Sequence, residues 1–230
     1  DDAAEENLRA ILSLDSRDAA SFGNLERLYR QRSRWRELRE LCERRLKIVQ
    51  DAWEKATLLY EMAKLDQDKL GDPRRAAEMY RAALALDPEF LPALDGAAAL
   101  AFAQGDWARA RELYDRLGDR GILSADDMLA RRGLIAERLG DRAQAMRSYE
   151  EALGKNASNF EAAEAMGRLK AALGDKEGAI EGLRRALDLA QADAERAGEV
   201  AAALCAVLLG AGRRDEARAL VEEVRTGHPD

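Results

Sequence analysis

Residues able to do catalytic or metal chemistry are few and widely separated in this chain of 230 residues. The two cysteines, Cys42 and Cys205, form no CxxC pair, and the single histidine, His228, lies two residues from the end. A nucleophile needs a neighbouring base, and a structural zinc ion needs about four clustered ligands. We therefore expect no enzymatic activity, no cofactor and no metal site. Both cysteines are interpreted as packing residues in a reducing compartment.

The composition favours a folded, all-α protein. Hydrophobic residues make up 47% of the chain and charged residues 35%, values that are typical of globular domains. Alanine, leucine, arginine and glutamate are abundant, and these side chains lose little rotamer freedom in a helix. The most apolar stretch, residues 200–211, is shorter than the roughly 20 residues that cross a bilayer, so we expect no direct membrane insertion. We expect a cytoplasmic location, or a periplasmic one if the full-length protein carries an export signal.

The formal net charge of −7 argues against a nucleic-acid partner, because neutralising phosphates requires a basic surface. One segment departs from this balance, since residues 27–47 hold nine basic and three acidic residues. Two interpretations of this Arg-rich segment are open. It is either a solvated helix surface with internal Glu–Arg pairs or a contact surface for an acidic partner.

The strongest pattern in the chain is an internal repeat. Five glycines recur at spacings of 34, 35, 34 and 38 residues: Gly71, Gly105, Gly140, Gly174 and Gly212. An alanine follows each glycine by five residues, a larger residue stands four further on, and a small or aliphatic residue stands three beyond that. The larger residues are Tyr80, Tyr114, Tyr149, Leu183 and Val221. Five units in register predict an array of stacked repeats.

The spacing predicts that each unit is a helix, a tight turn and a second helix. Side chains at offsets of four and three lie on one face of a helix, so the segment after each glycine is amphipathic. The glycine ends the preceding helix because a left-handed cap costs little without a Cβ. A single hairpin cannot cover its own apolar face, so the units must stack into an α-solenoid.

Two weaker copies precede these five. In one, Ser33 takes the place of the glycine and is followed by Leu38 and Cys42 at the alanine and large-residue positions. In the other, only the second half remains, over residues 1–16. Extra residues precede the first helix of two units, near residues 51–56 and 194–197, and we expect those helices to be longer by about one turn.

The pattern resembles the tetratricopeptide repeat family over essentially the whole chain. The repeat of that family is a helix–turn–helix of about 34 residues with a small residue on the first helix, Gly-Asp at the turn, then alanine, an aromatic residue and alanine. The fifth unit matches it through Gly133, Gly140, Asp141, Ala145, Tyr149 and Ala152. The resemblance implies a right-handed α-solenoid of stacked helical hairpins.

The resemblance also gives the three tryptophans an interpretation. Trp35 and Trp107 each lie two residues after a turn, where the family packs a large side chain between hairpins. A structural role is therefore favoured over ligand stacking for both. Trp53 falls in one of the irregular insertions, where both roles stay open.

We predict a single array over residues 1–230, with a half repeat at 1–16 and repeats at about 19–50, 51–88, 91–122, 125–157, 160–191 and 194–229. The chain starts on the second helix of a unit and stops without a polar capping helix, so we expect a fragment of a longer protein. Arginine outnumbers lysine and alanine is plentiful, which favours a bacterial source.

In the resembling family, partners bind in the concave groove lined by the first helix of each repeat. Counting back from the turns places these residues in that groove: Arg27, Arg30, Glu61, Leu65, Asp68, Asp95, Ala99, Phe102, Ala103, Arg131, Leu134, Glu137, Arg138, Glu164 and Arg168. Such a mixture suits a helix or extended peptide with hydrophobic anchors and charged flanks. We expect Phe102 and Leu134 to lie outside the packing between hairpins and to form the centre of the contact.

The leading hypothesis is a protein–protein interaction scaffold or adaptor that binds another protein or peptide in this groove. One alternative is a regulatory or substrate-docking arm of a larger enzyme whose catalytic domain lies outside this chain. A third class is RNA binding by a related helical-repeat architecture, and the acidic net charge counts against it.

Overall fold

The computed structural model describes residues 2–190 and 193–227, and within these ranges the chain forms thirteen α-helices, one short 3-10 helix and no strand. This confirms the predicted all-α helical-repeat solenoid. The chain divides into two compact units, Asp1–Arg120 and Gly121–Asp230, which are called the N-terminal and C-terminal units. None of the helices in the described ranges is long and apolar enough to cross a membrane.

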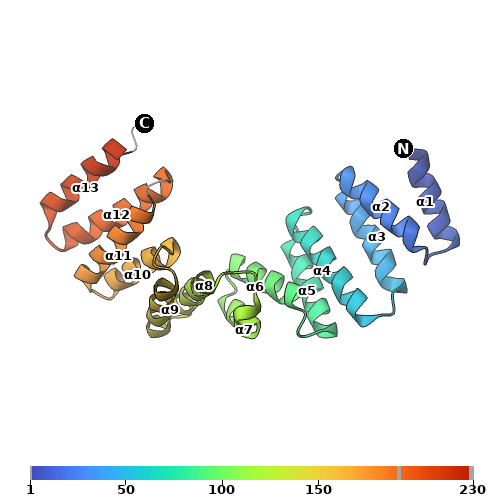
Figure 1. Ribbon diagram of the computed structural model, residues 1–230, viewed down its shortest axis with the longest axis horizontal. Coiled ribbons are helices and arrows are strands. Elements are labelled where there is room, and N and C mark those ends of the chain that lie inside the picture. The colour runs from blue at the N-terminus through green and yellow to red at the C-terminus, as the bar shows by residue number, and fades with distance from the viewer. Residues whose placement is uncertain (1, 191–192, 228–230) are drawn as a thin grey trace. The chain divides into compact units, whose positions relative to one another are not determined.

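Helices that follow one another in sequence pack against one another within each unit (Figure 1). The N-terminal unit contains α1 (Asp2–Leu14), α2 (Ala19–Gln31), α3 (Trp35–Ile48), α4 (Ala52–Asp68), α5 (Pro73–Leu86), α6 (Leu91–Ala103), α7 (Trp107–Leu117) and the 3-10 helix Gly118–Arg120. The C-terminal unit contains α8 (Ala125–Arg138), α9 (Arg142–Lys155), α10 (Phe160–Ala172), α11 (Lys176–Leu189), α12 (Ala194–Gly210) and α13 (Arg214–Gly227). The even-numbered helices are the first helices of hairpins, and the odd-numbered ones that follow are the second.

The turns inside the hairpins follow the repeat. The five recurring glycines all have positive φ angles, from +64° to +86°, and Ser33 is the one non-glycine residue with a positive φ in the described chain, at +53°. Ser33 therefore occupies the glycine place, as predicted. The aspartate after the glycine accepts a hydrogen bond from a backbone N–H in the next helix, as at Asp141, whose Oδ1 lies 2.9 Å from the Gln144 nitrogen. At four of the five turns, glycine ends one helix and aspartate begins the next, whereas Gly212 is followed by Arg213.

The two predicted long helices are present. Helices α4 and α12 each have 17 residues, whereas the others have 11 to 14. Each begins at an aspartate cap: Asp51 accepts from the Glu54 N–H and Asp193 accepts from the Arg196 N–H. The inserted residues thus extend the first helices at their N-termini.

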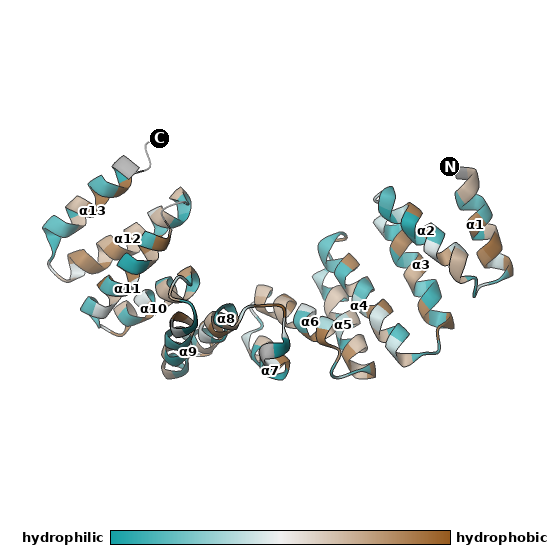
Figure 2. Ribbon diagram, in the orientation of Figure 1, coloured by the Kyte–Doolittle hydropathy of each residue, from teal (hydrophilic) through white to brown (hydrophobic). Residues whose placement is uncertain are grey.

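The repeated small and large residues form the core. The alanines at 76, 110, 145 and 179 are fully buried, and so are the residues that follow them by four: Tyr80, Tyr114, Tyr149 and Leu183. The exception is Val221, which is 55% exposed on α13, the last helix described. Figure 2 shows both hydrophobic and hydrophilic residues on the helices, which is the distribution expected of amphipathic helices packed on one side.

Candidate partner-binding surfaces

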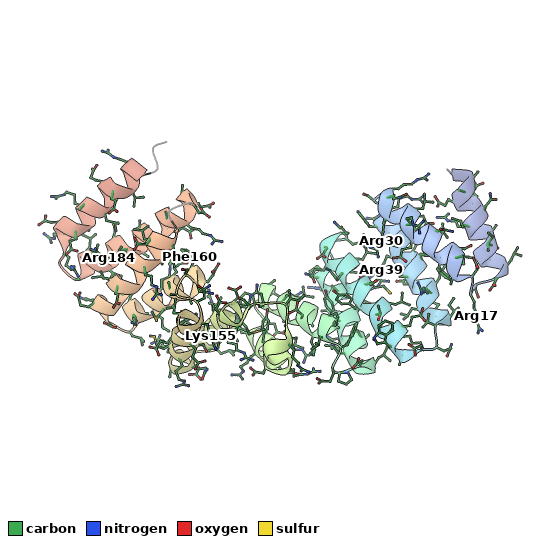
Figure 3. The ribbon with its side chains drawn as sticks, in the orientation of Figure 1. Arg17, Arg30, Arg39, Lys155, Phe160 and Arg184 are labelled. Atoms are coloured by element: carbon green, nitrogen blue, oxygen red, sulfur yellow. The ribbon has the colours of Figure 1, made fainter. Side chains whose placement is uncertain are left out.

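Helices α2 and α4 bring together predicted groove residues in the N-terminal unit. The Arg30 guanidinium lies 2.9 Å from the Glu26 carboxylate on its own helix and 3.5 Å from the Glu61 carboxylate on α4. Figure 3 labels Arg30, whose side chain lies in this unit together with that of Arg39. Arg27 is exposed one turn before Arg30 on α2. The exposed sides of these two first helices therefore present a charged, solvent-accessible surface.

A cavity of about 460 Å³ opens beside this ion pair. It is lined by residues from α2, α3 and α4: Arg30, Trp35, Leu38, Cys42, Tyr60, Glu61, Lys64, Leu65, Asp68 and Lys69. Four of these, at positions 30, 61, 65 and 68, are among the predicted groove residues. Leu65 is only 8% exposed, so it belongs to the floor of the cavity rather than to its rim. The volume of the cavity falls within the range of ligand-binding sites.

Sequence reasoning missed the other half of this cavity. Trp35, Tyr60 and Lys69 lie at its walls and mouth, and Cys42 lies on its floor. A signal was present in the repeat, because Cys42 is small where other units have an aromatic residue. A second signal is Lys64, which lies seven residues before Gly71, at the place of the small residue Gly133 in the fifth unit.

The predicted apolar centre is packed more closely than expected. Phe102 on α6 is half-buried, and its ring meets Trp107 edge-on at 5.5 Å and Tyr114 at 6.4 Å between ring centroids. Both partners lie on α7, the second helix of the same hairpin, so these contacts leave the expectation that Phe102 lies outside the packing between hairpins as a prediction. Asp95 and Ala99 are half-buried on α6, and Ala103 is exposed at its end.

In the C-terminal unit, the predicted residues lie on α8 and α10. Glu137 accepts a hydrogen bond from the Tyr149 hydroxyl at 3.1 Å, so it supports the hairpin. Burial, followed by the Glu137 charge, raises the pKa of Tyr149. Glu164 and Arg168 form an ion pair at 2.7 Å on α10. Three further residues complete this surface: half-buried Arg131 and Leu134, and exposed Arg138.

Family models of the tetratricopeptide repeat match residues 21–56, 69–121 and 126–159, which together make up more than half of the chain. The chain belongs to the tetratricopeptide repeat (TPR) family. The matches fall on repeats in both units, so the TPR assignment does not depend on one part of the sequence. A comparison with curated protein sequences gave no match.

Solved structures share the TPR fold. The C-terminal part of a TPR repeat-containing protein from Cytophaga hutchinsonii has a TM-score of 0.74 at 12% identity, covering 98% of this chain and 89% of that one. YrrB, a TPR protein with an unusual peptide-binding site, gives 0.58 at 18% identity, covering 76% and 87%. MamA from Desulfovibrio magneticus RS-1 gives 0.64 at 15% identity, covering 76% and 96%. At identities of 12% to 18%, these structural similarities establish a common fold only.

The Arg-rich segment at residues 27–47 of the TPR array is largely paired. Arg34 lies 2.8 Å from Glu37, and this hydrogen bond raises the pKa of Arg34 and lowers that of Glu37. Arg45 lies 2.7 Å from Glu54 on α4. The buried Arg39 side chain lies 3.0 Å from Asp66, which is fully buried on α4. The Arg34–Glu37 pair is internal to the segment, as one of the two interpretations expects, whereas Arg39 and Arg45 pair with acidic residues of α4.

Part of the Arg-rich segment stays exposed on α3. Among the described residues, no ion pair involves Arg36, Arg44 or Lys47. A second cavity, of about 840 Å³, lies beside the Arg39–Glu43 pair and reaches Lys69 and Arg75. Its lining carries charges of both signs, so it has no single electrostatic preference.

The thiols of this TPR chain are held in their neutral form. Burial raises the pKa of the Cys42 thiol to about 11, with smaller contributions from the Glu26 and Glu61 charges. Burial also raises the pKa of Cys205. A thiol, unlike a thiolate, is a weak nucleophile and a weak metal ligand. In the described ranges, no three His, Cys, Asp or Glu side chains are grouped to hold a metal ion, and His228 lies outside those ranges.

Proposed function

We propose that this TPR protein is an interaction scaffold that binds a partner protein or peptide along the exposed sides of its first helices. The observation that carries the proposal is the open cavity between α2, α3 and α4, where Arg30, Glu61 and Asp68 surround an apolar floor. A few buried apolar contacts inside a polar rim supply most of the affinity in protein interfaces. YrrB, with its peptide-binding site on the same fold, supports the same use here.

The exposed sides of α8 and α10 offer a comparable surface in the C-terminal unit. Arg131 and Leu134 lie half-buried on α8, and the Glu164–Arg168 pair lies on α10. We propose this surface as a second contact region for a polypeptide. An array with several such regions binds extended partners through many modest contacts.

The test begins with affinity capture on the intact chain and identification of the captured protein by mass spectrometry. Binding of that protein is then measured by titration calorimetry for a double variant, Glu61→Lys with Asp68→Lys. Both side chains are exposed, so the variant should fold, and reversing two charges at the mouth of the cavity should change the affinity at least about tenfold. Circular dichroism checks the helix content.

The matched control reverses exposed charges on the second helices, with Arg36→Glu and Arg44→Glu on α3. If the partner uses the first helices, this control changes the salt dependence of binding more than its affinity. Normal binding by the Glu61/Asp68 variant together with lost binding by the control would place the partner on the Arg-rich segment and refute the groove.

A further inference from the structure

The cavity beside Cys42 lies where the array lacks one of its own aromatic rings. Cys42 stands nine residues after Ser33, and the same place holds Tyr80, Tyr114 and Tyr149 in three other hairpins. Those three tyrosines are at most 2% exposed. Their rings pack so closely that a Cβ added at Gly133 would lie 2.5 Å from the Tyr149 ring, and one added at Gly96 would lie 2.6 Å from the Tyr80 ring. The ring at this position normally fills the space between helices.

Cys42 is too short to fill that space. The cavity of about 460 Å³ has an apolar floor formed by Leu38, Cys42 and Leu65, which are 1%, 8% and 8% exposed. Trp35 and Tyr60 are half-buried at its sides. Apolar side chains therefore enclose a space that opens toward solvent. An aromatic ring in such a space gains both from burial and from contact with the rings beside it.

The rim of the cavity favours a negative group next to that ring. Glu61 is paired with Arg30 at 3.5 Å. Lys64 is exposed and forms no ion pair with any described residue. The Lys69 ammonium lies 5.4 Å from the centre of the Trp35 ring. With Arg30 and Glu61 paired, three charged residues of the rim remain. Lys64 and Lys69 are positive, and Asp68 is negative.

We infer that this cavity receives an aromatic side chain of a partner polypeptide, with an acidic residue beside it. The inference rests on the proposed function and specifies the chemistry of the partner. The partner's ring lies on the apolar floor of the cavity beside Cys42, and its neighbouring carboxylate lies against Lys64. A buried aromatic anchor of this kind is typical of the residues that dominate interface affinity.

The first experiment measures peptide binding through the Trp35 indole N–H in NMR spectra of the intact chain. The probe is the blocked peptide Gly-Ser-Tyr-Asp-Ser-Gly, and the matched control has alanine in place of tyrosine. The tyrosine peptide should bind at least about tenfold more tightly. Equal binding of the two peptides, or no shift at Trp35, would overturn the inference.

The decisive variant is Cys42→Tyr, which supplies the ring that the other hairpins have. It should fill the cavity and weaken binding of the tyrosine peptide at least about tenfold, whereas Cys42→Ser, which keeps the cavity open, should bind like the parent. If Cys42→Tyr fails to fold, Lys64→Glu tests the same site, because Lys64 is exposed. The parent should bind the peptide with aspartate next to the tyrosine more tightly than a peptide with lysine at that place, and Lys64→Glu should invert this preference. An unchanged preference would overturn the inference.

The captured partner separates this inference from the proposed function. Binding that Cys42→Tyr abolishes and that the Glu61/Asp68 variant strengthens supports both, because the added lysines attract the acidic residue beside the ring. Normal binding by Cys42→Tyr with lost binding by the Glu61/Asp68 variant overturns the aromatic anchor and leaves the scaffold function intact. A parent dimer that Cys42→Tyr dissolves would identify a second copy as the occupant and overturn the assignment to a partner.

Discussion

The junction between α3 and α4 and the junction between α9 and α10 solve one packing problem in two ways. Arg39 and Met146 hold the same repeat position on the second helix, six residues after the turn residue. Asp66 and Leu169 hold the same position on the following first helix, five residues before the turn glycine. The N-terminal unit thus has a buried ion pair where the C-terminal unit has apolar side chains.

The ion pair is well satisfied by its surroundings. Arg39 Nε lies 3.0 Å from both oxygens of Asp66, and Nη1 lies 2.7 Å from Glu43. Two buried charges still lose their hydration, so such a pair adds little net stability over an apolar contact. It is directional, however, because the carboxylate and guanidinium are satisfied in one alignment of the helices. We interpret the ion pair as fixing which hairpins stack, and the apolar junction as supplying cohesion.

The largest effect is expected when one partner of the pair is removed. Arg39→Met copies the C-terminal unit at one position and leaves the fully buried Asp66 without its main charge partner. The free energy of unfolding should fall by about 3 to 5 kcal/mol. Urea unfolding followed by circular dichroism measures the change. A loss below about 1 kcal/mol would show that the pair contributes no more than an exposed salt bridge.

The double variant Arg39→Met with Asp66→Leu is the control for that prediction. It installs the side chains of the α9–α10 junction at the α3–α4 junction. Its unfolding free energy should return to within about 1 kcal/mol of the parent or exceed it, because no buried charge remains. A double variant as unstable as Arg39→Met would mean that the two junctions differ in backbone geometry and not only in side chains.

A smaller effect is expected from the hairpins themselves. Gly133 lies against the Tyr149 ring, and the equivalent residue of the α2–α3 hairpin is Glu26, seven residues before Ser33. Gly133→Leu should destabilise the array by about 1 to 3 kcal/mol through overpacking. Glu26→Leu should change stability by less than about 1 kcal/mol, since it loses only the exposed Arg30 pair. Thermal melts of both variants test this, and equal losses would contradict the difference between the hairpins.

The next largest effect on stability is expected from substitutions at the turns. Ser33 has a φ of +53°, a conformation that glycine adopts at lower cost than other residues. Ser33→Gly should therefore raise the unfolding free energy by about 0.5 to 1 kcal/mol, after allowing for the greater freedom of glycine in the unfolded chain. The reverse change in the C-terminal unit, Gly140→Ser, should lower it by a similar amount. A destabilised Ser33→Gly protein would show that the serine side chain has a structural role at the turn.

The sequence was sufficient for features that depend on local rules repeated along the chain. Ser33 at the glycine position, the longer α4 and α12, and the buried tyrosines all follow from spacing and helix geometry. The Arg39–Asp66 pair did not, because its members lie in different repeats and nothing in either helix identifies the other. The contacts of Phe102 with Trp107 and Tyr114 were not predicted either, since they depend on how α6 and α7 cross.

Four residues that line the cavity were among the predicted positions: Arg30, Glu61 and Asp68 at its rim and Leu65 on its floor. Counting back from the turns identified exposed positions such as Arg30 and Glu61, because first helices present the same face in every repeat. The cavity arises from a departure from the repeat, where Cys42 replaces a tyrosine. Such a departure from the repeat predicts that side-chain volume is missing at this position. It does not predict whether neighbouring side chains move into the space. That outcome depends on side chains such as Trp35 and Tyr60, which line the cavity from two different helices.

The smallest effect concerns a polar contact between α8 and α10 in the C-terminal unit. Asp126 Oδ2 accepts hydrogen bonds from Asn159 at 3.0 Å and Asn156 at 2.8 Å, and Asn159 also caps α10 by accepting from the Ala162 N–H. The hydrogen bonds from Asn159, Ser124 and Asn156 lower the pKa of Asp126 to about 2. A lowered pKa in the folded state means that the contact stabilises the fold above the ordinary value of 3.8 and loses that contribution as the pH falls toward about 2.

An NMR titration of the Asp126 carboxyl carbon should therefore give a midpoint near pH 2. Asn159→Ala should move the midpoint toward the ordinary value more than Asn156→Ala does, because Asn159 is the largest cause of the shift. Protonation should also speed hydrogen exchange at the Ala162 amide, since Asn159 would lose its anchor on α8 and cap α10 less firmly. A midpoint that neither variant moves would show that the carboxylate is stabilised by Ser124 and the N-terminus of α8, and that the two helices are held together by their apolar contacts.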